Sequence, residues 1–201
     1  MASQTNRDLV RLYWPGELRP AFDALFAIDD VMAEVVASAS QPALAAIKLA
    51  WWREALERLD DSPPPGEPRL QAAASELLPR GVSGRDLARL EAGWAAQLEE
   101  HPYAGAVAER GALLFELAAR LLGVEQSTPD AGRLWAQADL ARRFSRPLPQ
   151  AERELSSPPR LRPLTALAAP ANRAVRRGLP FEPEATPGRA WTLLRHRLTG
   201  R

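Results

Sequence analysis

The sequence of 201 residues has no cysteine, one lysine (Lys48) and only two histidines. Without cysteine the chain can form neither a disulfide scaffold nor a thiolate metal site, and it has no cysteine nucleophile. Two histidines are too few for a metal site built from several of them. We expect His101 in a loop and His196, which stands between two arginines, on the surface.

Long apolar runs are also absent. No stretch approaches the roughly 18 uncharged apolar residues of a membrane-spanning helix. The first residues, Met1 to Asp8, lack the apolar segment of a signal peptide. These absences predict a cytoplasmic protein, with peripheral contact to the inner membrane left open.

Strand signals are scarce, because β-branched residues are few and do not alternate with polar ones. Helical periodicity runs through nearly the whole chain, and 46% of the residues are hydrophobic, enough for one core. We therefore expect an all-α, single-domain helical bundle over residues 1–201, with an irregular proline-rich connector at 145–163. Helices are predicted at approximately 5–13, 17–36, 42–59, 69–78, 83–98, 102–122, 129–144, 164–177 and 187–198.

The apolar faces of these helices indicate which residues form the core. We expect Phe22, Phe26, one of the two tryptophans at 51 and 52, Leu114 and Leu117 to pack around one central space. Ser40 is a candidate N-cap for the helix that begins at Pro42. Pro170 should kink or divide the helix predicted at 164–177.

The charge is small overall but unevenly distributed. The formal net charge of +1 argues against a protein built to hold nucleic acid. Residues 139–201 contain 13 arginines and 5 acids, a net charge of +8, whereas residues 1–138 carry −7. Coding from a GC-rich genome, which favours alanine, arginine and proline, accounts for such a composition without any function. The alternative is a basic C-terminal third that contacts an anionic membrane or an acidic partner.

Three acids form the sharpest local pattern in the sequence. Asp30 and Glu34 stand four residues apart, which places both carboxylates on one helix face, and Asp29 lies beside them. Carboxylates on an inward-facing helix can hold Mg²⁺, which prefers oxygen ligands and shares them with phosphates. The alternative is that these acids form the solvated side of an amphipathic helix.

A second pattern is the sequence Trp51-Trp52-Arg53. Two adjacent helical residues point about 100° apart, so one tryptophan can lie in the core while the other lines a groove. Arg53 can pair with Glu57 four residues later. The alternative is a packed core helix with ion pairs on its surface.

With these patterns in view, the chain resembles the squalene/phytoene synthase family. The resemblance is carried by Pro20–Asp30 (PAFDALFAIDD) and Leu49–Leu56 (LAWWREAL), and it continues through Leu113–Gly123 and Ala131–Ala138. Members of this family join two isoprenoid diphosphates head to head inside an all-α fold. Two aspartate-rich motifs on facing helices hold Mg²⁺ and diphosphate.

The resemblance assigns roles to particular residues. It implies substrate binding by Asp29, Asp30, Glu34, Trp52 and Arg53, with Asp30 and Glu34 as metal ligands. It implies Mg²⁺ as a cofactor only for an active enzyme.

The sequence also departs from the family's pattern. Ala33 stands where a further aspartate is usual, and the region of the second motif, Asp139 to Phe144, has one acid and two arginines, Arg142 and Arg143. Arginines there would pair with the acids of the first motif and repel a second metal ion. The run from Phe26 through Pro42 to Arg53 is closer to a non-enzymatic branch, similar to the complex I assembly factors with a synthase-like fold.

The favoured interpretation is a degenerate, non-enzymatic family member that acts as a binding or assembly protein. One alternative is an active Mg²⁺-dependent transferase of isoprenyl groups, and another is a lipid-binding protein at a membrane surface. Expected partners are an isoprenoid or lipid ligand, or another protein. A carboxylate pair facing Asp30 would favour the enzyme, whereas an interior filled by side chains would favour the scaffold.

Overall fold

The computed structural model describes residues 6–101, 103–126, 128–144, 157–178 and 186–200, and within these ranges it contains helices and no strands. The predicted all-α class is confirmed. None of the described helices combines the length and apolar character needed to cross a membrane. The α-helices are α1 (Asn6–Arg11), α2 (Arg19–Ala37), α3 (Pro42–Arg58), α4 (Pro68–Glu76), α5 (Gly84–Ala88), α6 (Glu91–Ala95), α7 (Ala104–Leu121), α8 (Pro129–Arg143), α9 (Arg162–Thr165), α10 (Ala169–Arg177) and α11 (Pro187–Thr199).

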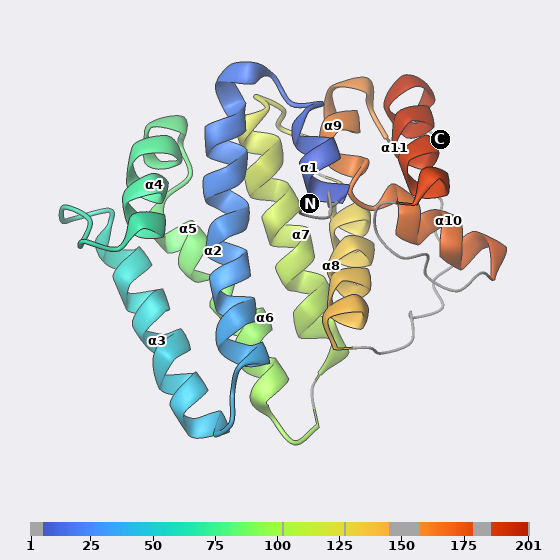
Figure 1. The fold of residues 1–201 in the computed structure, drawn as a ribbon. Coiled ribbons are helices and arrows are strands. Elements are labelled where there is room, and N and C mark those ends of the chain that lie inside the picture. Colours follow the sequence, from blue (N-terminus) through green and yellow to red (C-terminus); the bar gives the residue numbers. More distant parts are fainter. Residues whose placement is uncertain (1–5, 102, 127, 145–156, 179–185, 201) are drawn as a thin grey trace.

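Helices α2, α7 and α8 form the middle of the bundle (Figure 1). Helices α3 to α6 lie on one side of them, and α1 and α9 to α11 lie on the other. Phe22, Phe26, Trp52, Leu114 and Leu117 all belong to one hydrophobic core cluster, as predicted. The inward-facing tryptophan of the pair is Trp52, and its neighbour on α3 is exposed.

Several predicted helix boundaries hold because proline or a capping side chain fixes them. Pro20, Pro42 and Pro129 each lie in the first turn of a helix, where the missing N–H leaves no hydrogen bond unmade. Ser83 and Asp86 form a complete capping box at the start of α5. Ser40 is not the N-cap of α3, because Gln41 takes that position and makes no side-chain capping bond.

The segment predicted as one helix at 83–98 is divided into α5, α6 and a short 3₁₀ turn at Ala96–Leu98. The backbone stays nearly helical across the division, where the N–H of Leu90 donates to the carbonyl of Leu87 at 3.1 Å. That bond spans three residues and tightens the turn. The apolar stripe is nevertheless kept, since Leu87, Leu90 and Trp94 are all buried.

The C-terminal region follows the predicted division. A break after α9 separates it from α10, and Pro170 occupies the first turn of α10. Of the predicted connector at 145–163, residues 145–156 lie outside the described residues. The remainder contains a 3₁₀ turn at Pro159–Leu161 and the start of α9.

Helices α7 and α8 approach each other closely at two glycines. A side-chain carbon added at Gly132 would collide with the carbonyl oxygen of Gly111, and one added at Gly111 would collide with the carbonyl oxygen of Gly132. The contact therefore requires that both positions lack a side chain. Gly111 adjoins Arg110, and Gly132 lies seven residues, about two turns, before Asp139, so this contact sets how closely those two charged residues face each other.

His196 is buried rather than exposed, contrary to the prediction from its two arginine neighbours. Only 4% of the residue is accessible, and its Nε2 lies 2.8 Å from Oγ1 of Thr165 in α9. Burial, together with the nearby charge of Arg162, lowers the pKa of His196 to about 4. The ring is therefore neutral near pH 7 and joins α11 to α9 by a hydrogen bond.

Replacing Gly132 with alanine should destabilise the protein by about 2 kcal/mol, because the new methyl group must force α7 and α8 apart. The better helix propensity of alanine offsets part of this cost. Urea denaturation of the variant measures the change. The control is Gly66→Ala, where an added carbon would meet nothing within 4 Å and the effect should stay below about 0.5 kcal/mol. Equal stabilities of the two variants would contradict the close contact.

Acid should destabilise the protein through His196. The unfolded chain takes up a proton on this ring near pH 6.5, whereas the folded protein resists it down to about pH 4. The unfolded state thus binds more protons within this window, so the free energy of unfolding falls as the pH falls, by about 3 kcal/mol in total. The test compares urea denaturation of the wild type and His196→Asn across the window. The wild type should show the steeper loss; parallel pH profiles would count against the assignment.

Candidate functional site

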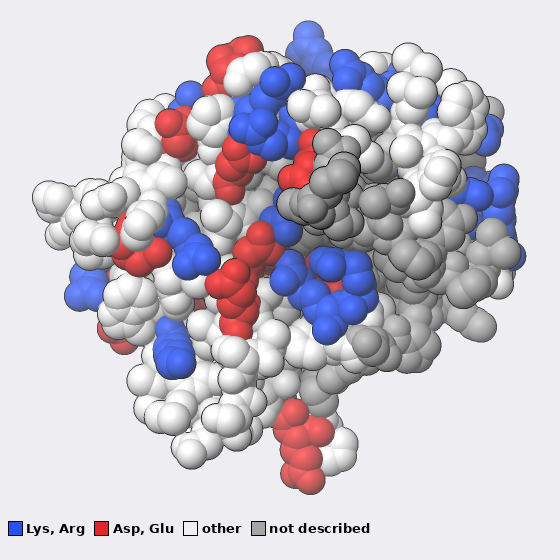
Figure 2. All heavy atoms as spheres, viewed as in Figure 1, with Lys and Arg blue, Asp and Glu red and all other residues white. Residues whose placement is uncertain are grey.

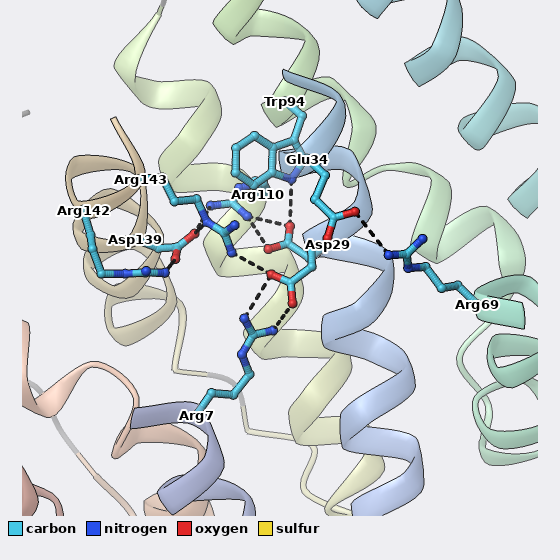
Figure 3. A network of polar contacts seen from close by, with 10 residues as sticks. Arg7, Asp29, Glu34, Arg69, Trp94, Arg110, Asp139, Arg142 and Arg143 are labelled. Atoms are coloured by element: carbon cyan, nitrogen blue, oxygen red, sulfur yellow. Dashed lines mark hydrogen bonds and ion pairs between the residues drawn. The ribbon is translucent and has the colours of Figure 1, made fainter. Parts of the chain in front are cut away.

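Asp29 lies on the apolar face of α2, and 1% of it is accessible. Arg110 of α7 places Nη1 2.5 Å from both carboxylate oxygens of Asp29. The indole N–H of Trp94 in α6 donates to Oδ1 at 2.9 Å (Figure 3). The guanidinium of Arg110 also lies over the Trp94 ring, 4.0 Å from its centroid. Asp29, to which the resemblance assigns a role in substrate binding, is thus held by a buried arginine and an indole.

Asp30, the next residue on α2, is held by two other arginines. Arg7 of α1 donates through Nη1 and Nη2 at 2.5 and 3.0 Å, and Arg143 of α8 donates through Nη2 at 2.6 Å. The predicted pairing of an α8 arginine with the acids of the first motif is therefore confirmed for Arg143. Burial alone would lower the pKa of Arg7, but the hydrogen bond to Asp30 and the negative charges of Asp30, Asp139 and Asp29 together outweigh it and raise that pKa.

Asp139 is the single acid on the facing helix α8 within this network. It accepts from Arg142 at 2.7 Å and from Nε of Arg143 at 2.8 Å, and Nη2 of Arg110 lies 3.9 Å away. Burial would raise the pKa of Asp139, but the charges of Arg143, Arg110 and Arg142 outweigh it and lower that pKa. Burial would likewise lower the pKa of Arg143, but its pairing with Asp139 and Asp30 raises it. Asp139 and Arg143 therefore stay charged at neutral pH.

The other sequence-predicted site residues lie outside this network. Glu34 is at the exposed edge of α2 and pairs with Arg69 of α4 at 3.1 Å. Trp52 is buried in the core, and Arg53 is exposed on α3. Among the described residues, no hydrogen bond or ion pair joins Trp52 or Arg53 to Asp29 or Asp30. The structure therefore brings together two of the five predicted residues, Asp29 and Asp30, with the arginines.

The arrangement does not fit a Mg²⁺ site. A Mg²⁺ ion requires carboxylate oxygens that face a common point, but here the three aspartates are occupied by four arginines: Arg7, Arg110, Arg142 and Arg143. Within the described ranges no group of three or more acidic or histidine side chains is placed to hold a metal. Nε and Nη2 of Arg110 are buried without a hydrogen-bond acceptor. Four arginines and three aspartates leave the network with one excess positive charge.

Figure 2 shows acidic and basic atoms side by side across the middle of the molecule. Neighbouring opposite charges neutralise one another, so this part of the molecule is not a purely acidic surface. What the network can do chemically is to bind helices α1, α2, α6, α7 and α8 together. Within the described part of the chain, no acidic wall faces Asp30.

Sequence reasoning missed Arg7, Arg110 and the role of Trp94. A signal for Arg110 was present, because it stands three residues after Val107 and four before Leu114 on an otherwise apolar stripe. Asp29 occupies the equivalent position on α2, four residues after Leu25 and three before Met32. One acid and one base, each on a buried helix face, indicate a buried pair.

Comparison with known proteins gives one match. Residues 1–131 match the family model described as squalene/phytoene synthase. The matched range includes α1 to α7 and ends near the start of α8, so Asp139 and its arginines lie beyond it. No curated protein and no solved structure matches the chain.

Removing Arg110 should destabilise the protein strongly. Arg110→Met leaves Asp29 buried with only the Trp94 N–H, and we expect a loss of about 3–5 kcal/mol in the free energy of unfolding. Urea denaturation measures it, and Arg120→Met on the same helix, which removes partly exposed ion pairs, is the control with an expected loss of about 1 kcal/mol.

The double variant Asp29→Leu/Arg110→Met distinguishes a charge effect from lost packing. Removing both charges together should restore most of the stability lost in Arg110→Met, because no uncompensated ion stays buried. If the stability lost in the double variant equals the sum of the losses in Asp29→Leu and Arg110→Met, the pairing is refuted.

Proposed function

The chain belongs to the squalene/phytoene synthase family, and we propose that it is a degenerate member that acts as a binding or assembly protein and does not ionise isoprenoid diphosphates. The observation that carries this proposal is the occupation of Asp29 by Arg110. The same contact that stabilises the fold takes up one of the carboxylates of the first aspartate-rich motif.

Electrostatics supports this proposal. Ionising an isoprenoid diphosphate requires Mg²⁺ ions that stabilise the departing pyrophosphate. Arg7 and Arg143 lie on Asp30, and their positive charges would repel a metal ion that approaches the same carboxylate. A bare anion would be attracted instead. The absence of a carboxylate pair facing Asp30 among the described residues points the same way.

An exposed apolar stripe supports the binding part of the proposal. Leu44, Ile47 and Trp51 stand at positions i, i+3 and i+7 of α3, and all three are exposed. Exposed apolar side chains that line up on one helix face are typical of surfaces that bind another protein. The resemblance to the non-enzymatic branch agrees with such a role.

The alternative function is a Mg²⁺-dependent prenyl transferase, and one experiment separates the two. Isothermal titration with farnesyl diphosphate, with and without Mg²⁺, is combined with a pyrophosphate-release assay. We expect weak or no Mg²⁺-dependent binding and no pyrophosphate, because arginines occupy Asp29 and Asp30.

Two variants of α2 complete the experiment. Asp30→Ala removes the carboxylate in the network, and Asp23→Ala removes an exposed one that pairs with Arg11. Tight Mg²⁺-dependent binding with turnover that is lost in Asp30→Ala and kept in Asp23→Ala would establish the transferase. Binding without turnover supports a ligand-holding protein, and no binding shifts the role toward a protein partner.

A further inference from the structure

In the described part of the chain after α8, no residue is acidic and the charged residues are arginines. Residues 157–178 and 186–200 contain eight arginines and no aspartate or glutamate. In Figure 2 the coloured atoms at the right-hand side, where Figure 1 places α10 and α11, are blue and white with no red. The described residues of this region therefore carry only positive charge on the α9–α11 side of the bundle.

A pocket of about 550 Å³ lies between α10 and α11. Its lining includes Arg173, Arg176, Arg177, Arg195 and Trp191, and none of the described residues that line it is acidic. Arg173 joins the two helices, since its Nη1 donates to the carbonyl of Gly188 and to the hydroxyl of Thr192, both at 2.9 Å. The pocket is thus a built feature of the helix pair and carries several positive charges.

Three of these arginines are available to an outside anion. Arg176, Arg177 and Arg195 are exposed and make no ion pair with any described residue. Arg176 and Arg177 lie three and four residues after Arg173, on the same face of α10. Their guanidinium groups suit phosphate, to which arginine donates two parallel hydrogen bonds.

Helix α11 adds an apolar stripe beside the charges. Trp191, Leu194 and Leu198 are 66%, 41% and 67% exposed, and with Arg195 they occupy an arc of about 100° on the helix. The opposite face of α11 is anchored, because Leu193 and His196 are buried. The stripe is therefore presented by a helix that is already packed on the protein.

We propose that the surface formed by α10 and α11 docks on an anionic phospholipid membrane, with lipid phosphates in the pocket and the stripe of α11 in the interfacial region. Arginines attract anionic headgroups, and tryptophan and leucine enter the boundary between headgroups and acyl chains. A soluble phosphate would use the arginines but leave the three apolar side chains in water. The combination of both features selects a membrane as the occupant.

This docking does not depend on the proposed function. The surface lies on the α10–α11 side of the bundle, whereas Asp29 and Asp30 lie on α2 in the middle (Figure 1). A result on diphosphate binding therefore leaves the membrane test unchanged.

The test is co-sedimentation of the full chain with vesicles. Vesicles of phosphatidylcholine alone are compared with vesicles of phosphatidylcholine and phosphatidylglycerol in equal amounts. The protein should bind the anionic vesicles and not the neutral ones. The variant Arg176→Gln/Arg177→Gln/Arg195→Gln should lose about a hundredfold in vesicle affinity, because each basic residue near an anionic surface contributes a factor of about five.

A second triple variant, Lys48→Gln/Arg58→Gln/Arg89→Gln, is the matched control. These residues are exposed on α3 and after α5, and the variant changes the net charge of the protein by the same amount. It should bind within about threefold of the wild type, since a local surface and not the total charge binds the membrane. Equal losses in the two triple variants would overturn the proposal.

Tryptophan fluorescence tests the apolar contact. Brominated lipids in the anionic vesicles should quench the emission of the wild type, and Trp191→Phe should lose most of that quenching. Quenching that is unchanged in Trp191→Phe would overturn the insertion of α11. Saturable binding of inorganic phosphate without any vesicle binding would overturn the membrane as the occupant.

Discussion

The buried pair of Arg110 and Asp29 is the interaction on which the middle of the bundle depends. An isolated charge in an apolar interior costs far more than a folded protein can supply, so each of these ions requires the other. Only 2% of Arg110 and 1% of Asp29 are accessible. Because one residue lies on α7 and the other on α2, the pair fixes the relative position of these helices.

The pair also constrains its surroundings. Trp94 must present its N–H to Asp29 and its ring face to Arg110, which fixes the orientation of α6. Gly93 leaves room for the stem of Arg110, since a side-chain carbon there would collide with it. The contact of α7 with α8 then brings Arg110 to 3.9 Å from Asp139. The charged network and the glycine contacts are therefore parts of one arrangement.

The sequence was sufficient to predict most of the helices and the neighbouring acids Asp29 and Asp30, because helices and spacings within a helix depend on residues close together in the chain. Periodicity over a few turns defines a helix, and a spacing of three or four residues defines one of its faces. The partners could not be read in the same way, since Arg110 lies 81 residues after Asp29 and Arg143 lies 113 after Asp30. The charged neighbours of His196 predict an exposed position, whereas its place on the helix face predicts burial. It stands three residues after Leu193 and seven after Arg189, both of which are buried.

The use of arginine at the centre of the bundle has a consequence for how the protein depends on its medium. A metal ion that bridges carboxylates is in exchange with solution, so its occupancy varies with the free ion concentration and falls when a chelator is present. Arg110 is a covalent part of the chain and cannot dissociate. The counterion of Asp29 is thus supplied at a fixed ratio of one per molecule, and the cohesion of α2 with α7 is independent of divalent ion supply.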